Sequence, residues 1–196
     1  MVDVARKRAT YAEYMAFAET SEIKHEYIDG EIVAMSGGTI VHGRLIGQLT
    51  GLVRDALKGR ACVVLPAEVR VRIRAADRAT YPDLHVVCAA VEADPDDPHA
   101  VVNPTVIAEV LSESTADSDR GDKFAAYRRL RSLREYVLVS QHERRIDLYR
   151  RDGRRWVLEE FGPGEKLLLE SIEVELAVDE VYADALGAIV PARQPP

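Results

Sequence analysis

Two carboxylates and one lysine have the residue types and the surroundings that phosphodiester chemistry needs. Asp83 follows a proline at the start of an apolar run that ends at Cys88, and Glu109 lies inside a second apolar run, Val106–Leu111. Lys123 lies in the polar segment that follows this second run. An unpaired charge in a protein interior costs several kcal/mol, so Glu109 needs a partner. We therefore expect Asp83, Glu109 and Lys123 to converge, as in a metal-dependent phosphodiesterase.

Hydrophobic patterns predict the elements that must position these three residues. Thr10 followed by Glu13 begins a short helix over 10–18, and Asp-Gly between two apolar stretches predicts a hairpin over 25–35. The segment 91–104, rich in Pro and Asp, is expected to be a solvated connection. The remaining predicted elements are a helix at 41–57, strands at 61–73, 82–88 and 105–112, a helix at 118–130, a strand at 135–140, a hairpin over 145–161, a strand at 173–176 and a helix at 178–188.

The order of the central elements is helix, three strands, helix, strand (α-β-β-β-α-β). This order predicts an α/β fold with a mixed central sheet and an added hairpin towards each end of the chain. Domains typically contain roughly 50–250 residues, so residues 1–190 are expected to form one domain. Residues 191–196 are expected to be a disordered tail.

The two-residue period of a strand predicts which side chains meet. Asp83 and His85 share one face of their strand, and Ile107, Glu109 and Leu111 share one face of theirs. If the two strands are neighbours, Asp83 and Glu109 can hold Mg²⁺ or Mn²⁺, because magnesium is usually bound by one or two carboxylates and several waters. A lysine nearby would position or activate a metal-bound water and neutralise a phosphate.

Four further side chains are candidate accessory residues. His42 opens a predicted helix and His85 shares the face of Asp83, so either can touch a metal or a substrate, although a lone histidine is more often structural. Glu31 and Glu68 are candidate accessory carboxylates. The sequence contains no Gly-rich phosphate loop, no Cys/His zinc spacing and no Gly-x-Ser-x-Gly motif, which argues against a P-loop nucleotide triphosphatase, a zinc finger and a serine hydrolase.

Charge is unevenly distributed along the chain. The net charge is −7, yet residues 120–155 carry 12 Lys and Arg against 5 Asp and Glu, a local charge of +7. This segment is either a phosphate-facing surface or a solvated face. If it faces phosphate, its candidate contacts are Arg128, Arg129, Arg131 and Arg134.

The cysteines and the apolar runs bear on the location of the protein. Cys62 and Cys88 both lie in apolar runs and are expected to be reduced, buried side chains in a reducing compartment. The first eight residues do not resemble a secretory signal, and no apolar run approaches the length of a membrane span. A cytoplasmic protein without membrane contact is therefore expected.

Together these motifs resemble a known family. Tyr81-Pro82-Asp83 before an apolar run, then Glu109-Val110-Leu111-Ser112 and a downstream Asp/Lys pair, are similar to the PD-(D/E)XK nuclease superfamily and its restriction-endonuclease branch called Uma-two. Asp-Gly-Glu at 29–31 and Glu-Tyr at 135–136 fit the same branch. The resemblance implies a restriction-endonuclease-like fold, a magnesium-dependent endonuclease, DNA as substrate and a site of Asp83, Glu109 and a lysine. A homodimer is expected, because two copied sites can cut two strands.

The sequence departs from this family pattern at one position. The lysine expected two residues after Glu109 is replaced by Leu111, and the nearest replacement is Lys123, one helical turn after Asp119. Two hypotheses follow. Lys123 either takes the place of the missing lysine in a nuclease, or the chain is a nuclease-like module that no longer cuts and serves as a binding or regulatory partner.

Overall fold

A six-stranded mixed sheet forms the framework of the protein. The computed structural model describes residues 8–112 and 115–183, and within them this sheet has the strand order β12-β11-β10-β9-β6-β3. The central strands β9 and β10 are parallel, and the other neighbouring pairs are antiparallel. The bounds are β3 Cys62–Pro66, β6 Leu84–Cys88, β9 Val106–Leu111, β10 Glu135–Ser140, β11 Ile146–Asp152 and β12 Arg155–Phe161. The predicted α/β class and mixed sheet are confirmed.

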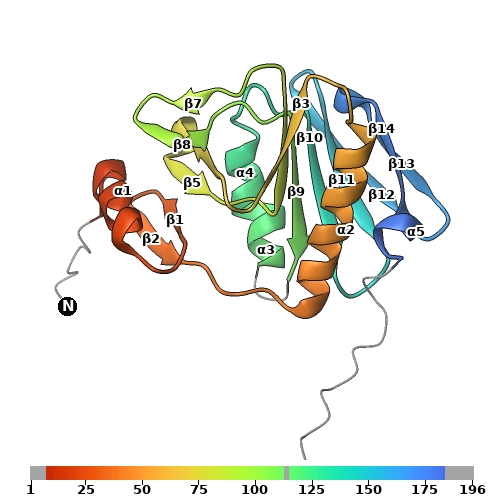
Figure 1. The fold of residues 1–196 in the computed structure, drawn as a ribbon, viewed down its shortest axis with the longest axis horizontal. Coiled ribbons are helices and arrows are strands. Elements are labelled where there is room, and N and C mark those ends of the chain that lie inside the picture. The colour runs from red at the N-terminus through yellow and green to blue at the C-terminus, as the bar shows by residue number, and fades with distance from the viewer. Residues whose placement is uncertain (1–7, 113–114, 184–196) are drawn as a thin grey trace, which may run out of the picture.

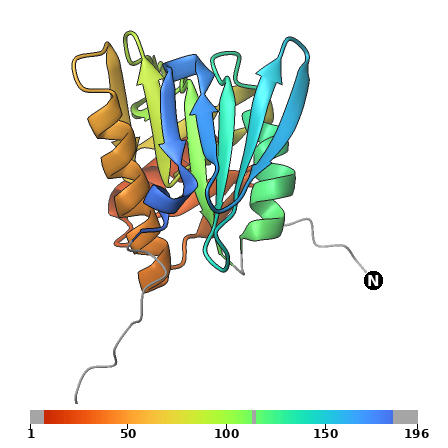
Figure 2. The same ribbon diagram turned by 90° about the vertical axis from the view of Figure 1, so that its right-hand side faces the viewer.

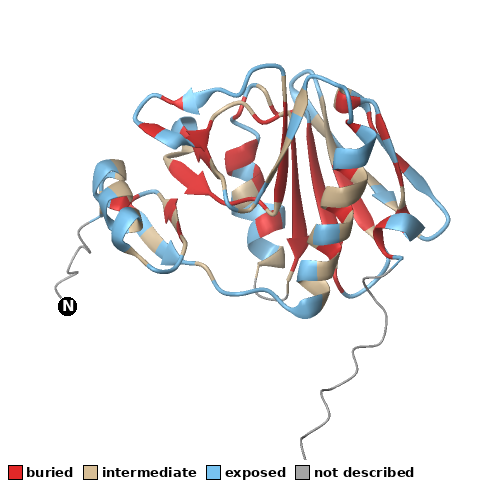
Figure 3. Cartoon of the chain, viewed as in Figure 1, coloured by how far each residue is buried: buried red, intermediate tan, exposed pale blue. Residues whose placement is uncertain are grey.

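Helices cover both faces of this sheet (Figures 1 and 2). Helix α2 (Ile40–Ala56) packs on one face together with the hairpin β13–β14 (Lys166–Leu169 and Val174–Ala177) and the short helix α5 (Val178–Val181). On the other face lies a helical segment made of α3 (Ala116–Ser118), a π-helical turn η2 (Asp119–Lys123) and α4 (Phe124–Tyr127). Strands β9 and β10 are buried almost throughout between these layers (Figure 3).

A second sheet, which the sequence did not predict, lies beside the first. Its strand order is β2-β1-β5-β4-β8-β7. The predicted long strand at 61–73 is wrong, because the chain turns after Pro66 and divides into β3 in the first sheet and β4 in the second. The bounds are α1 Tyr11–Thr20, β1 His25–Ile28, β2 Glu31–Ala34, β4 Arg70–Ile73, η1 Arg74–Ala76, β5 Arg78–Thr80, β7 Ala93–Asp94 and β8 Asp97–Val101.

The Pro- and Asp-rich segment 91–104 is not the solvated connection that was predicted. It forms β7 and β8, and the carboxylates of Asp94 and Asp97 are buried. Each pairs with an arginine, Asp97 with Arg70 at the start of β4 and Asp94 with Arg74 at the start of η1. Buried carboxylates are stable only when they are paired, and these pairs explain how so acidic a segment joins a sheet.

The local signals near the N-terminus are confirmed. Thr10 and Glu13 form a capping box at the start of α1, and Asp29 and Gly30, both with positive φ, make the turn between β1 and β2. Farther along the chain, the predicted helix at 118–130 begins earlier and ends at Tyr127. Of the predicted helix at 178–188, residues 178–181 form α5, and residues 184–196, including the predicted tail, lie outside the described residues.

No helix in the described ranges combines the length and the apolar character that crossing a lipid bilayer requires.

The two cysteines form a disulfide, so the prediction of reduced cysteines is wrong. Cys62 and Cys88 lie directly opposite each other in the antiparallel pair β3–β6. Residues that face each other in such a pair have neighbouring Cβ atoms, and a disulfide forms when these approach to about 3.5–4.5 Å. The sequence could not show this, because it does not give the register of the two strands. The cysteines no longer support a reducing compartment, and the cytoplasmic location stays a prediction.

Reduction of this disulfide is expected to destabilise the fold. The bond spans a sequence separation of 26 residues, and closing a loop of this size contributes about 3 kcal/mol by restricting the unfolded chain. Dithiothreitol should therefore lower Tm by roughly 6–12 °C. The Cys62→Ala/Cys88→Ala variant is the control, because its Tm should not respond to the reductant. Equal Tm values for the oxidised and the reduced protein would contradict this expectation.

His85 is a buried histidine that has no polar partner within residues 8–112 and 115–183. Its side chain is fully buried in β6, and among the described residues neither ring nitrogen has a hydrogen-bond partner. Burial lowers the pKa of His85 from 6.5 to about 4. The unfolded chain therefore takes up a proton at this residue at a higher pH than the folded chain does. It follows that stability falls as pH drops from about 6.5 to about 4.

Replacing His85 is expected to remove this acid sensitivity. Between pH 7 and pH 5 the wild type should lose about 2 kcal/mol more unfolding free energy than His85→Leu, since each unit of pKa difference corresponds to about 1.4 kcal/mol. At pH 7 the leucine variant should be as stable as the wild type or more so, because no hydrogen bond is lost. Urea unfolding in the presence of chelator measures both effects. If the unfolding free energies of the two proteins changed equally with pH, His85 would have a hydrogen-bond partner in solution.

Candidate functional site

The pairing of β6 with β9 brings Asp83 and Glu109 together. The register places Leu84 opposite Ala108, so Asp83, one residue before β6, lies opposite Glu109. The backbone N–H of Asp83 donates to Glu109 Oε2 at 3.2 Å, and the N–H of Val110 donates to Asp83 Oδ2 at 2.7 Å. Each carboxylate thus accepts a hydrogen bond from the other strand. The predicted convergence of the two residues at one end of their strands is confirmed.

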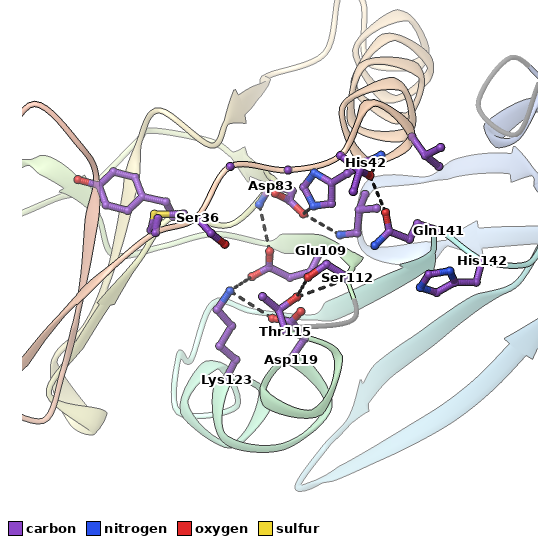
Figure 4. Close-up of a pocket in the computed structure, with 17 residues that line it drawn as sticks. Ser36, His42, Asp83, Glu109, Ser112, Thr115, Asp119, Lys123, Gln141 and His142 are labelled. Carbon is purple, nitrogen blue, oxygen red and sulfur yellow. Dashed lines mark hydrogen bonds and ion pairs between the residues drawn. The ribbon is translucent and has the colours of Figure 1, made fainter. Parts of the chain in front are cut away.

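Lys123 reaches the same place from the π-helical turn (Figure 4). Its Nζ lies 3.3 Å from Glu109 Oε1, 3.2 Å from Asp119 Oδ1 and 3.5 Å from Glu26 Oε1. The expected ion pair between Lys123 and Glu109 is therefore present. A π-helical turn inside an α-helix is rare and frequently occurs at functional sites.

Tyr127 also binds Glu109. Its hydroxyl donates to Glu109 Oε1 at 2.8 Å and lies 3.0 Å from the Thr80 hydroxyl. Burial raises the pKa of Tyr127 well above its usual value, and Glu109 raises it further, so the hydroxyl stays protonated and remains a donor. Because Tyr127 donates to Glu109, the Thr80 hydroxyl donates to Tyr127 in turn. This chain of hydrogen bonds links the second sheet to the carboxylate.

The electrostatics of the site follow from its burial. The side chain of Glu109 is 4% exposed. Burial raises the pKa of Glu109, the Lys123 ammonium opposes this, and the charges of Asp83 and Asp119 raise it further. For Lys123, burial alone would lower the pKa, but Glu109, Glu26 and Asp119 raise it well above the usual value. Lys123 is therefore a permanent cation at neutral pH.

His42 lies on the opposite side of Asp83 from Glu109 (Figure 4). Its Nε2 is 3.3 Å from Asp83 Oδ2, and the hydrogen bond to this carboxylate raises the pKa of His42. The backbone N–H of His42 donates to the Thr39 hydroxyl, which caps α2 and fixes the start of the helix. Gly38 allows the ring to lie there, because a Cβ at this position would meet His42 Nδ1 at 2.7 Å.

Asp83, Glu109, Lys123 and His42 line one pocket of about 570 Å³ at the carboxyl ends of the parallel strands β9 and β10. The loop 35–39, which leads from β2 to α2, forms one wall of the pocket, and Ser112 and Gln141, which directly follow β9 and β10, form another. Thr39 joins these two walls by donating its hydroxyl hydrogen to Gln141 Oε1 at 2.9 Å. The side chain of Asp83 is 17% exposed, whereas that of Glu109 is 4% exposed. Asp83 is therefore the carboxylate of this pair that is open to a ligand in the pocket.

The other predicted site residues do not line this pocket. Glu31 is exposed at the start of β2, Glu68 is exposed and pairs with Lys24, and His85 is buried inside β6. The predicted phosphate contacts lie at the opposite end of the sheet, since the backbone N–H of Arg134 donates to the carbonyl of Thr105 at the amino ends of β9 and β10. These contacts are Arg128, Arg129, Arg131 and Arg134, and their role with nucleic acid stays a prediction.

Sequence reasoning missed two residues of the site. Glu26 is an ordinary residue of β1 in the sequence, and only the packing of the second sheet against the helical segment brings it to Lys123. Tyr127 lies in the predicted helix at 118–130, where its spacing from Phe124 and Leu130 is that of an apolar stripe. Its spacing was a usable signal, because Asp119, Lys123 and Tyr127 follow each other at intervals of four residues and therefore share a helix face.

The Tyr127 hydroxyl is expected to stabilise the folded protein through Glu109. Tyr127→Phe removes a charge-assisted hydrogen bond from a buried carboxylate and should cost about 1–3 kcal/mol of unfolding free energy. Thr80→Val should be non-additive with Tyr127→Phe, since both variants break one chain of hydrogen bonds. The matched control is Tyr149→Phe on β11, whose hydroxyl makes no hydrogen bond within the described ranges. Urea unfolding that finds equal costs at positions 127 and 149 would contradict the role of Tyr127.

The chain has matches to one family model and to several proteins. The family model described as "Putative restriction endonuclease" (Uma2) matches residues 11–179. An uncharacterized protein of Synechocystis sp. strain PCC 6803 is 35% identical over 87% of this chain and 89% of its own length. A second uncharacterized protein of the same strain is 34% identical over 90% of this chain and 97% of its own length.

A solved structure has the same fold. A crystal structure described as "a putative nuclease belonging to DUF820 from Anabaena variabilis" superposes with a TM-score of 0.76 at 17% identity, over 90% of this chain and 99% of the other. At this identity the match establishes the fold alone.

Proposed function

Because the chain belongs to the Uma-two family of "Putative restriction endonuclease" proteins, we propose that it is a nuclease that hydrolyses phosphodiester bonds of DNA with Mg²⁺ or Mn²⁺. The observation that carries this proposal is the meeting of Asp83, Glu109 and Lys123 in one pocket, each delivered by a different element. The match covers most of the chain, so the proposal concerns the whole described fold.

The donor set of the pocket suits a hard divalent cation. The described residues include no cluster of three or more His, Cys, Asp or Glu side chains arranged around a metal position. Asp83 and Glu109 supply two carboxylates, which is the usual protein contribution to a magnesium ion that keeps several waters. Two buried oxygens nearby, Asp119 Oδ1 and Glu26 Oε1, share the Lys123 ammonium with Glu109. The site therefore has more negative charge than Lys123 alone balances.

Each residue has a distinct role in this proposal. A dication bound by Asp83 and Glu109 would lower the pKa of a bound water and offset charge on the phosphate. The Lys123 ammonium supplies a fixed positive charge beside Glu109, which stabilises an anion without moving a proton. The expectation that a lysine activates the water is therefore replaced by electrostatic stabilisation, because the raised pKa of Lys123 keeps its proton in place. His42 Nε2 holds Asp83 from the side of the pocket.

DNA as the substrate and a homodimer as the active form are proposals that rest on the family. The pocket is large enough for a phosphate and its neighbouring sugars, and its rim contains the polar side chains of Ser36, Ser112 and Thr115. A second copy of the chain would place an equivalent site on the second strand of a duplex.

Metal binding is expected to depend on the two carboxylates, and the rate of DNA cleavage is expected to depend also on Lys123. Asp83→Asn/Glu109→Gln should lose Mn²⁺ binding in calorimetry, since neutral amides replace both charged ligands. Lys123→Met should keep or strengthen Mn²⁺ binding, because it removes a competing cation and leaves the carboxylates. It should lose about 10²–10³ in the rate of plasmid nicking, as expected for one electrostatic stabiliser. Lys58→Met, on the exposed surface, is the matched control.

Two results would count against this proposal. Equal Mn²⁺ binding by the wild type and by Asp83→Asn/Glu109→Gln would place the metal elsewhere, and full activity of Lys123→Met would exclude the lysine from the mechanism.

The observation that favours the alternative function is Leu111 in the position of the family lysine. A wild type that binds Mn²⁺ and DNA but cuts neither DNA nor RNA with either ion would identify a binding or regulatory module.

A further inference from the structure

Arg78 of β5 is a buried arginine that has no counter-ion in the described part of the chain. It is 7% exposed, and its guanidinium forms neither an ion pair nor a hydrogen bond with any described residue. Its Nη1 is fully shielded from solvent. The neighbouring arginines of β4 and η1 differ, since Arg70, Arg72 and Arg74 pair with Asp97, Asp77 and Asp94.

Such a side chain needs an anion from outside the fold. A guanidinium does not lose its proton in proteins, so burial cannot neutralise Arg78 as it can a lysine. A buried charge without a partner is costly, and the cost is offset only when an opposite charge arrives. Arg70, Arg72 and Arg74, by contrast, each have a carboxylate partner among the described residues. The compensating charge must therefore come from the space that Arg78 lines.

Arg78 lines a pocket of about 480 Å³ that is separate from the pocket of Asp83 and Glu109. The walls are η1 and β5 on one side and the helical segment of η2 and α4 on the other, elements that lie side by side in Figure 1. Arg129, just after α4, contributes a second guanidinium. Its Nη1 donates to the carbonyl of Ala75, which fixes the group and leaves its other N–H donors available.

The acidic residues on the rim are already engaged. Asp29 pairs with Arg8, and Asp77 pairs with Arg72 and accepts from the Tyr27 hydroxyl. Asp122 is the remaining carboxylate of the rim, and it is exposed and forms no ion pair with another described residue. The charges not already balanced are therefore two guanidinium groups against one carboxylate.

We propose that this pocket binds a phosphate group between Arg78 and Arg129. Two guanidinium groups that approach from different elements suit a tetrahedral anion, which offers oxygens in several directions and accepts paired N–H donors. The phosphate comes either from a nucleic-acid strand or from a free phosphate compound. The first source rests on the proposed function, because the helical segment carries Lys123 of the candidate active site as well as a wall of this pocket. The second source is independent of nuclease activity.

The test measures binding without metal, so that it does not depend on cleavage. In the presence of chelator, inorganic phosphate is titrated by calorimetry into the wild type, Arg78→Met and Arg129→Met. The affinity of each protein for a labelled oligonucleotide is measured by fluorescence anisotropy at several salt concentrations. Arg154→Met, at the exposed turn between β11 and β12, removes the same charge far from the pocket and is the matched control.

Each source of phosphate predicts a different pattern. For a nucleic-acid phosphate, Arg78→Met should weaken oligonucleotide binding about tenfold or more and reduce the salt slope by about 0.7–0.9, the value of one phosphate contact. For a free phosphate, Arg78→Met should abolish the calorimetric binding and leave the oligonucleotide affinity unchanged. Both measurements are made in chelator and do not depend on cleavage, so failure of the nuclease proposal would not be confused with failure of this one.

Two results would overturn the proposal. The first is a wild type that binds no inorganic phosphate and whose oligonucleotide affinity is the same as that of Arg78→Met and Arg129→Met. The second is an internal ion pair, recognised when Asp122→Asn and Arg78→Met destabilise the protein non-additively and phosphate does not raise the Tm of the wild type. If Arg78→Met does not fold, Arg129→Met and the wild-type titrations decide the question in the same way.

Discussion

The buried ion pair between Lys123 and Glu109 is the interaction on which the arrangement of this protein depends. Its two members come from the two layers that enclose the site, the sheet and the helical segment. Removing Lys123 would leave Glu109 buried without a cation among the described residues, a change that typically costs about 3–5 kcal/mol. Glu26 of the second sheet joins the same cluster at 3.5 Å, so three structural units share one set of charges. The geometry of the candidate site is therefore also a condition for the fold.

The second sheet contributes to the site by restricting the helical segment. Thr80 at the end of β5 bonds the Tyr127 hydroxyl, and Glu26 of β1 contacts Lys123, so this sheet holds the helical segment at two points. The sheet itself is joined by pairs of buried carboxylates and arginines, of which Asp97 with Arg70 is the most buried. Pairs of this kind require correct partners, because a mismatched strand would bury an unpaired charge. Polar pairing thus fixes the register of a sheet with little apolar core of its own.

The sequence predicted most of the first sheet and the central trio of the site, because both depend on local patterns. Strands β6 and β9 have continuous apolar runs, and the carboxylate inside the second run is unusual enough to mark a site. The second sheet could not be predicted in the same way. Its strands are short, and Asp94 and Asp97 are polar residues that are buried only because arginines distant in the sequence reach them. The disulfide was missed for a related reason, since the register of β3 against β6 is set by tertiary packing.

The displaced lysine has a physical explanation in the packing around Leu111. This residue shares a strand face with Glu109 and is buried in the apolar cluster that includes Phe124 and Leu138. Phe124 directly follows Lys123, so the contact of Leu111 with this cluster helps to hold the helical segment in the position that brings the ammonium to Glu109. A lysine at position 111 would introduce a charge into that apolar contact and weaken the docking of the helix. The strand position therefore supports the helix, and the helix provides the cation that the strand lacks.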